Sequence, residues 1–215
     1  MPINRENFHL FSIGLFILLL FTFTLYNNQF YFKQPCQDDF RRQSLPLLLN
    51  SGLVHCNQAT GQYIIWTEKE KELPAIERTI RLTGLNWKKQ SLTDFSGRNA
   101  YKYTTIFQIK KENEGQFVEL FQRLNSCFKQ QNVQVYFEQR INVFLEPTAY
   151  FKHYDIGLCN SIQTDNLQSL TGYHKGFSKI VKAGSVESNV QIVAKELDGQ
   201  NGKTVLAFPT LLGEF

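Results

Sequence analysis

The chain has 215 residues, of which 42% are hydrophobic and 20% are charged, and its formal net charge is +4. This share of apolar residues is typical of a folded globular protein and excludes a largely disordered chain. The excess of positive charge is small and spread along the sequence, so we expect no nucleic-acid partner.

An uncharged apolar run dominates the N-terminus. Residues 7–32 contain no Asp, Glu, Lys or Arg, and large apolar side chains would surround a helix through them on all sides. About 20 helical residues cross the ~30 Å hydrocarbon core of a bilayer. We therefore expect a short tail at 1–8 and a retained, single transmembrane anchor at 9–31.

Two other interpretations of this run are a cleaved signal peptide and a buried helix of a soluble protein. Cleavage requires small residues after the apolar run, whereas the first alanine of the chain is Ala59. The flanking charges do not decide the orientation of the anchor. Arg5 precedes it, and Lys33, Arg41 and Arg42 follow it, which slightly favours a cytoplasmic C-terminal part.

The cysteines favour the opposite orientation. Cys36, Cys56, Cys127 and Cys159 all follow the anchor, and an even number there is typical of disulfide formation in an oxidising compartment. We expect Cys36 to pair with Cys56, which leaves Cys127 with Cys159. The alternative is that all four are ordinary thiols in a reducing cytosol.

The part after the anchor contains no Asn-x-Ser/Thr sequon, which disfavours a glycosylated ectodomain. We expect a bacterial inner-membrane protein whose C-terminal part is periplasmic. No linker rich in Pro, Gly or Ser divides that part. We expect a juxtamembrane segment at 32–59, an α+β domain at 60–146 and a β-rich extension at 147–215.

The α+β domain begins with a strand and a helix. Residues 62–66 form a short apolar run that predicts a strand. Thr67 and Glu70 have the spacing of a capping box, which predicts that a helix starts here. Gly84 is expected to end this helix, and a second strand is predicted at 85–90.

Three elements with clearer periodicity follow. Residues 101–110 alternate between apolar and polar side chains, as in a strand with one buried face. Residues 114–131 carry an apolar stripe at helical spacing that includes Cys127. Residues 133–145 alternate again and predict a long strand with one solvated face, in which Gln139 interrupts the apolar positions.

The order strand, helix, strand, strand, helix, strand is typical of the split βαβ arrangement. The predicted fold class is therefore α+β: a transmembrane helix, then a ferredoxin-like antiparallel sheet with two helices, then a β-rich extension. In the extension we expect a strand at 150–158. A hairpin is predicted between 189–195 and 203–208, and the sequence does not decide between helix and loop for 170–184.

No motif in the sequence predicts a cofactor, a metal centre or a catalytic residue. There is no Cys-x-x-Cys and no His-x-x-x-His, and the glycines at 199 and 202 are too close for a phosphate-binding loop. His153 and Asp155 would share one face of the predicted strand and could form an acid/base pair. An envelope hydrolase or thiol enzyme would require His153, Asp155, His174 or Cys159 to meet in one pocket.

Lys175, Lys179 and Lys182 are candidates for anion binding. Their spacing would place them on one face of a helix, where they could bind lipid headgroups or another polyanion. The alternative is a solvated surface helix.

These observations favour a single-pass membrane protein with an extracytoplasmic protein-interaction domain, for which we expect a protein partner. Subunits of bacterial secretion or pilus assemblies, and membrane-held immunity or inhibitor proteins, have this general plan, although that comparison rests on analogy. The alternatives are the envelope enzyme and the anionic-lipid or polyanion-binding protein described above.

Overall fold

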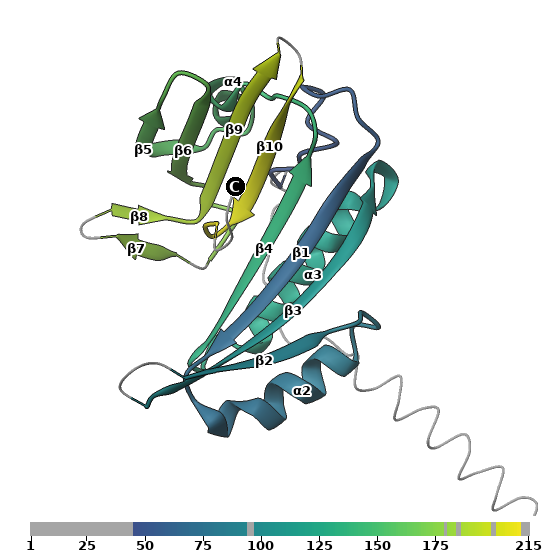
Figure 1. The fold of residues 1–215 in the computed structure, drawn as a ribbon, viewed down its shortest axis with the longest axis vertical. Coiled ribbons are helices and arrows are strands. Elements are labelled where there is room, and N and C mark those ends of the chain that lie inside the picture. The colour runs from purple at the N-terminus through teal and green to yellow at the C-terminus, as the bar shows by residue number, and fades with distance from the viewer. Residues whose placement is uncertain (1–44, 94–96, 179, 184–185, 199–200, 212–215) are drawn as a thin grey trace, which may run out of the picture. The chain divides into compact units, whose positions relative to one another are not determined.

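The computed structural model describes residues 45–93, 97–178, 180–183, 186–198 and 201–211. These residues form a mixed α+β structure in which eight strands make one large antiparallel sheet and a second, two-stranded sheet lies beside its C-terminal part (Figure 1). The α+β class predicted from the sequence is confirmed. The predicted anchor at 9–31 lies outside the described residues.

None of the helices in the described ranges has both the length and the apolar character that crossing a bilayer requires. Ser44–Phe215 group into one compact unit, which does not divide near residue 146. The residues after 147 instead extend the sheet that the preceding residues begin.

The first half of this unit contains eight elements. They are β1 (Gln58–Thr67), η1 (Glu70–Glu72), α2 (Leu73–Arg81), β2 (Lys88–Thr93), β3 (Asn99–Lys110), η2 (Lys111–Asn113), α3 (Glu114–Cys127) and β4 (Val133–Ile141). The second half follows with α4 (Pro147–His153), β5 (Gly157–Gln163), β6 (Leu167–Tyr173), β7 (Val181–Ala183), β8 (Val186–Ser188), β9 (Val190–Asp198) and β10 (Asn201–Phe208).

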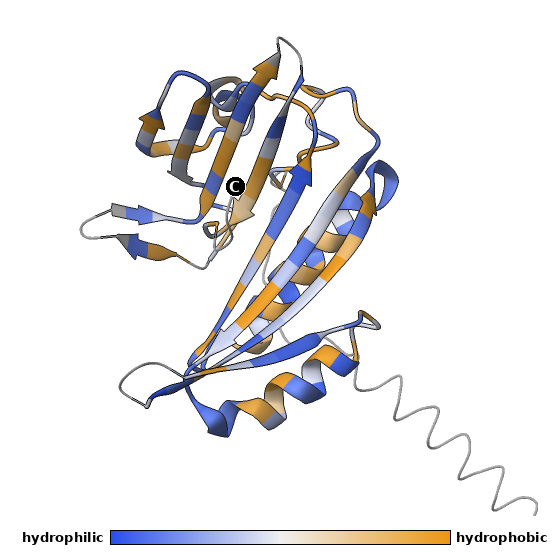
Figure 2. Cartoon of the chain, viewed as in Figure 1, coloured by the Kyte–Doolittle hydropathy of each residue, from blue (hydrophilic) through white to orange (hydrophobic). Residues whose placement is uncertain are grey.

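The strand order in the large sheet is β2-β3-β1-β4-β10-β9-β6-β5, with every neighbouring pair antiparallel. The two halves meet where β10 pairs with β4, which places Phe208 opposite Phe137. Apolar and polar residues alternate along the strands (Figure 2). This alternation gives the sheet one face that packs against helices.

The helices α2 and α3 contact the same face of the sheet. The Tyr63 hydroxyl on β1 donates to the Phe117 carbonyl oxygen in α3 (2.6 Å), and the Tyr103 hydroxyl on β3 donates to Glu77 in α2 (3.0 Å). Tyr63 pairs with Thr105, two residues from Tyr103, so both tyrosines point to one side of the sheet.

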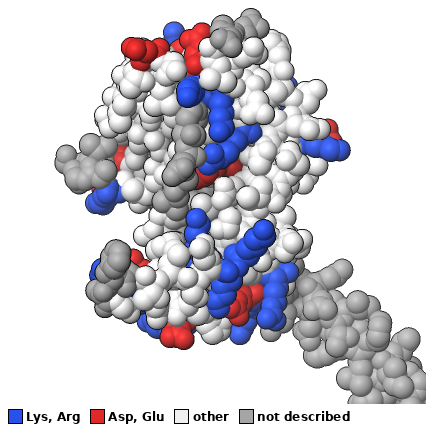
Figure 3. Space-filling view, in the orientation of Figure 1, with Lys and Arg blue, Asp and Glu red and all other residues white. Residues whose placement is uncertain are grey.

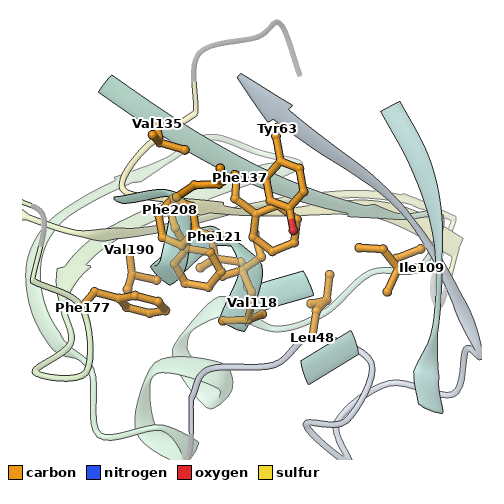
Figure 4. Close-up of a cluster of buried hydrophobic side chains, with 14 of the residues drawn as sticks. Leu48, Tyr63, Ile109, Val118, Phe121, Val135, Phe137, Phe177, Val190 and Phe208 are labelled. Carbon is orange, nitrogen blue, oxygen red and sulfur yellow. The ribbon is translucent and has the colours of Figure 1, made fainter. Parts of the chain in front are cut away.

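Aromatic side chains fill the core between this face and the helices (Figure 4). The ring of Phe137 lies 4.8 Å from that of Tyr63 and 6.0 Å from that of Phe121, measured between centroids. Phe208 continues the cluster to Phe177 at 4.5 Å. Because β4, β10, α3 and the loop after β6 all contribute, the two halves share one core.

A buried carboxylate attaches the residues before β1 to this core. Glu114, the first residue of α3, is fully buried, and its Oε1 accepts from the backbone N–H groups of Leu48 (2.6 Å) and Leu49 (2.8 Å). Its Oε2 accepts from the backbone and side chain of Asn50 (2.8 and 2.9 Å), and Gln139 Nε2 donates to Oε1 (3.1 Å). Five donors thus offset the loss of hydration of one buried charge.

Most of the elements predicted for 60–146 are confirmed with small shifts of their bounds; β2, for example, begins at Lys88 rather than at residue 85. The solvated face predicted for the strand at 133–145 is wrong. β4 ends at Ile141, and Glu138, expected on that face, is fully buried because it lies in the middle of the sheet, where it forms an ion pair with Arg140 (2.8 Å).

The capping box at Thr67 and Glu70 is wrong. The Thr67 hydroxyl accepts from the Lys69 N–H (3.1 Å) and donates to the Asn132 carbonyl (2.9 Å), so it joins β1 to the start of β4.

The strand predicted at 150–158 is also wrong, because residues 147–153 form α4. Pro147 starts this helix, and the Glu146 side chain caps it by accepting from the Thr148 N–H (3.2 Å). Tyr150 and Phe151 are buried, so the aromatic residues that suggested a strand form the apolar side of a short helix. The predicted hairpin is confirmed as β9 and β10.

A matched pair of glycine substitutions tests the left-handed backbone conformation of Gly84. Gly84, after α2, has φ +68°, which strains any residue with a Cβ, whereas Gly115 in α3 has open space around its Cβ position. We expect Gly84→Ala to lower the free energy of unfolding by about 1 kcal/mol and Gly115→Ala to raise it by about 0.5 kcal/mol. Urea unfolding followed by tryptophan fluorescence measures both, and a stabilising Gly84→Ala would contradict the assignment.

Replacement of the buried carboxylate tests the attachment of residues 45–50. Glu114→Gln places an amide NH₂ against backbone or side-chain donors, so we expect the unfolding free energy to fall by about 3 kcal/mol. Glu119→Gln, at an exposed position of the same helix, is the control and should change it by less than about 0.5 kcal/mol. Equal effects of the two substitutions would show that Glu114 has no special role.

Candidate interaction surface

The two edges of the large sheet differ in chemistry. β2 forms one edge and begins with Lys88 and Lys89, whose charges oppose the docking of another strand. β5 forms the other edge, and its sequence, Gly-Leu-Cys-Asn-Ser-Ile-Gln, contains no charged residue. Its residues are exposed except for Cys159, which is half-buried. β5 thus lacks the charges that normally protect a sheet edge.

Large apolar side chains are exposed at this edge. Leu158 is 60% exposed and Ile162 is 56% exposed on β5, and Tyr173 at the end of β6 is 41% exposed. Leu158 pairs with Gly172 and Ile162 with Ser169, with a bulge between Leu158 and Asn160. Since residues 169 and 172 lie on opposite faces of β6, Leu158 and Ile162 are presented on opposite faces of the edge strand.

We call the surface formed by β5 and Tyr173 the β5 edge. The sequence did not predict it, because no strand was expected at 159–163 and the exposure of its side chains depends on which strands flank it. The absence of charge in residues 157–163 is the one signal that could have indicated it.

The cysteines among the described residues are free thiols. Cys56 is half-buried, with a pKa that burial raises, and Cys127 is exposed at the end of α3 rather than on its apolar side. Cys159 lies at the bulge of β5, where its Sγ donates to the Glu187 carbonyl oxygen (3.2 Å). The expected disulfide between Cys127 and Cys159 is wrong, because both are free and Cys159 lies on β5 whereas Cys127 ends α3. Cys36, the expected partner of Cys56, lies outside the described residues.

The expected lysine face of a helix is not present in the described residues. Lys175 follows β6 in a loop, and Lys182 lies on the short strand β7, where it forms an ion pair with Glu187 of β8 (2.6 Å). Lys179 lies outside the described residues. Because Lys175 and Lys182 sit in a loop and a strand, helical spacing does not bring them together.

The residues considered for acid/base or thiol chemistry lie in different elements, some of them buried and some exposed. His153 is the last residue of α4, and Asp155 follows it in a turn with φ +52°, so they are not neighbours on a strand. His174 is buried and Cys159 is on the β5 edge. Within the described ranges, no group of three His, Cys, Asp or Glu side chains could hold a metal ion.

A shallow hollow of about 220 Å³ lies at the other end of the sheet, where β1 ends and β2 meets β3. Trp66, Leu92 and Ala100 supply apolar wall, and Glu68 and Arg98 supply charge. None of the candidate residues His153, Asp155, His174 and Cys159 lines this hollow.

His174 is held by a buried asparagine. Oδ1 of Asn189 accepts from the His174 N–H (2.7 Å), and its Nδ2 donates to the carbonyl oxygens of His174 and Phe177 (both 2.9 Å). The imidazole Nδ1 accepts from the Gly176 N–H (3.1 Å). This network fixes the loop that places Phe177 in the core.

Comparison with protein families and with curated protein sequences finds no match for this chain. Its function must therefore be inferred from its own residues and geometry.

The buried imidazole predicts a pH dependence of stability. Burial, and to a smaller extent the nearby Lys175, lower the pKa of His174 below 6.5, while Asp155 partly opposes them. The unfolded chain therefore takes up this proton before the folded chain does, so the contribution of His174 to stability is fully present above pH ~6.5 and is lost as the pH drops below it.

We expect His174→Gln to reduce the loss of unfolding free energy between neutral pH and pH ~5, measured by urea unfolding across that range. His153→Gln, at an exposed histidine, is the matched control and should retain the wild-type slope. A His174→Gln protein with the wild-type slope would contradict the assignment.

Proposed function

We propose that this chain is a membrane-anchored protein-interaction module, and that the β5 edge is its binding surface. The uncharged run at 7–32 is long enough to act as the anchor at 9–31. We include in this proposal a periplasmic location at a bacterial inner membrane, which the described cysteines, being free thiols, do not support. A subunit of a secretion-type or pilus-type envelope assembly, or a membrane-held inhibitor, fits this description.

The β5 edge is the observation that carries the proposal. A neutral edge strand with exposed apolar side chains is suited to accept a strand from another protein, because main-chain hydrogen bonds then extend the sheet and side-chain pockets give specificity. Three of the seven exposed large hydrophobic residues of the described chain, Leu158, Ile162 and Tyr173, belong to this surface. Leu158 and Ile162 lie on opposite faces of β5, so a strand added at this edge would meet an exposed apolar side chain on each face.

We also propose that the first half belongs to the ferredoxin-like class. The strand order β2-β3-β1-β4 and the position of α2 and α3 on one face support this assignment. The β-rich residues after 147 would then extend such a sheet by four strands and create the new edge at β5.

A matched pair of isoleucine substitutions tests the β5 edge as a binding surface. Ile162→Lys puts a charge on the edge, and Ile106→Lys makes the same change at an equally exposed position of β3. Full-length protein purified in mild detergent should retain a stoichiometric protein partner in the Ile106→Lys variant. Ile162→Lys should weaken that binding by about tenfold or more.

Two results would overturn the proposal. One is that the wild-type protein, purified gently, has no stoichiometric partner. The other is that Ile162→Lys binds its partner as tightly as Ile106→Lys does. Urea unfolding of both variants serves as the folding control.

A further inference from the structure

A basic segment connects α2 to β2. Residues 78–89 contain Arg78, Arg81, Lys88 and Lys89 and no acidic residue. Arg78 and Arg81 lie in the last turn of α2, and the two lysines begin β2. Figure 3 shows basic side chains at this end of the molecule, with acidic side chains between them. We call residues 78–89 the basic loop.

The shape of the basic loop is fixed by internal hydrogen bonds. The Thr83 hydroxyl donates to the Ile80 carbonyl oxygen (2.7 Å) and accepts from the Leu85 N–H (3.3 Å) and the Trp87 indole N–H (3.0 Å). The Trp87 ring stacks on Tyr63 with a centroid distance of 6.2 Å. Because the loop is held in this way, its basic side chains project from a rigid base.

Three of the four basic side chains form no direct ion pair with a described residue, although the charge of Arg81 also acts on Glu77. Lys89 forms an ion pair with Glu77 (2.9 Å) and lies above the Tyr103 ring. Arg78, Arg81 and Lys88 are exposed, and no ion pair joins them to another described residue. Leu82 lies beside Arg81 and is 71% exposed, the highest value among the exposed large hydrophobic residues. The surface therefore combines positive charge with one projecting apolar side chain.

We propose that the basic loop rests on the anionic lipid headgroups of the membrane that holds the chain; this inference depends on the proposed anchor. Arginine binds phosphate with two parallel hydrogen bonds, and basic residues near an anionic leaflet are attracted to it. An exposed leucine among them enters the interface, as in other peripheral membrane contacts. Single-stranded nucleic acid is less suited to this surface, because the Trp87 ring that could stack on a base is already stacked on Tyr63.

The length of the chain before residue 45 allows this contact. Residues 32–44 separate the expected anchor from the first described residue, and an extended chain of that length spans at most about 45 Å. A folded unit of this size has a radius of gyration of about 16 Å. The folded part is thus kept within about its own diameter of the bilayer, so few charges suffice to hold one end against it.

The experiment uses the full-length protein in lipid nanodiscs, one set of phosphatidylcholine alone and one set that also contains phosphatidylglycerol. Hydrogen–deuterium exchange is measured for peptides covering residues 78–90 and for the core strands β1 and β4. In the anionic discs we expect exchange of the basic loop to slow by about tenfold relative to the neutral discs. High salt should remove this difference, because it screens the attraction.

Two double variants complete the test. Arg81→Glu with Lys88→Glu should abolish the lipid-dependent protection, and Arg81→Gln with Lys88→Gln should weaken it while disturbing the fold less. The control, Lys129→Glu with Lys152→Glu, makes the same change of net charge at exposed positions elsewhere and should retain the protection. Unchanged exchange in β1 and β4 shows that each variant is folded.

Equal exchange of the basic loop in neutral and anionic discs would overturn the inference. So would protection by added oligonucleotide in neutral discs that exceeds the protection by anionic lipid. Failure of the full-length protein to enter nanodiscs at all would instead refute the anchor, and with it the proposed function. The two failures are therefore distinguishable.

Discussion

The fully buried carboxylate of Glu114 is the constraint that joins the parts of this structure. It accepts hydrogen bonds from the chain before β1, stands at the start of α3, and is contacted by the Gln139 side chain of β4. A buried charge is tolerated only when donors surround it, so these three segments must be in place together. The aromatic core packs against α3 and β4, two of the segments that Glu114 holds together.

The two edges of the large sheet differ in chemistry, and each edge strand belongs to a different half of the folded unit. β2, in the first half, follows the basic loop and begins with two lysines. β5, in the second half, is uncharged and exposes Leu158 and Ile162. One edge of the sheet is therefore basic and the other neutral and partly apolar, with one continuous core between them.

Periodicity predicted the elements of the first half because their apolar faces are regular. It could not predict how the second half joins them, since the pairing of β10 with β4 depends on contacts between residues far apart in sequence. The sequence predicts a strand in place of α4 because Tyr150 and Phe151 suit a strand as well as a short helix. Only Pro147 at the start of the helix and the Glu146 cap distinguish the two. Gln139, which interrupted the apolar face of its strand, is explained by Glu114, whose burial no local pattern reveals. The sequence could not predict the candidate surfaces either, because the exposure of a side chain depends on which strands lie beside it in the assembled sheet.

The attachment at Glu114 has a mechanical consequence for an anchored protein. Tension applied to the chain before residue 45 would load the Leu47 carbonyl oxygen, which accepts from the Tyr154 hydroxyl (2.9 Å), and then the N–H groups of Leu48, Leu49 and Asn50, which all bond to the Glu114 carboxylate. Bonds that share a load in this way resist separation better than bonds that break one after another. If the proposed anchor holds the chain in a membrane, tension from it is therefore resisted at these contacts before it reaches β1.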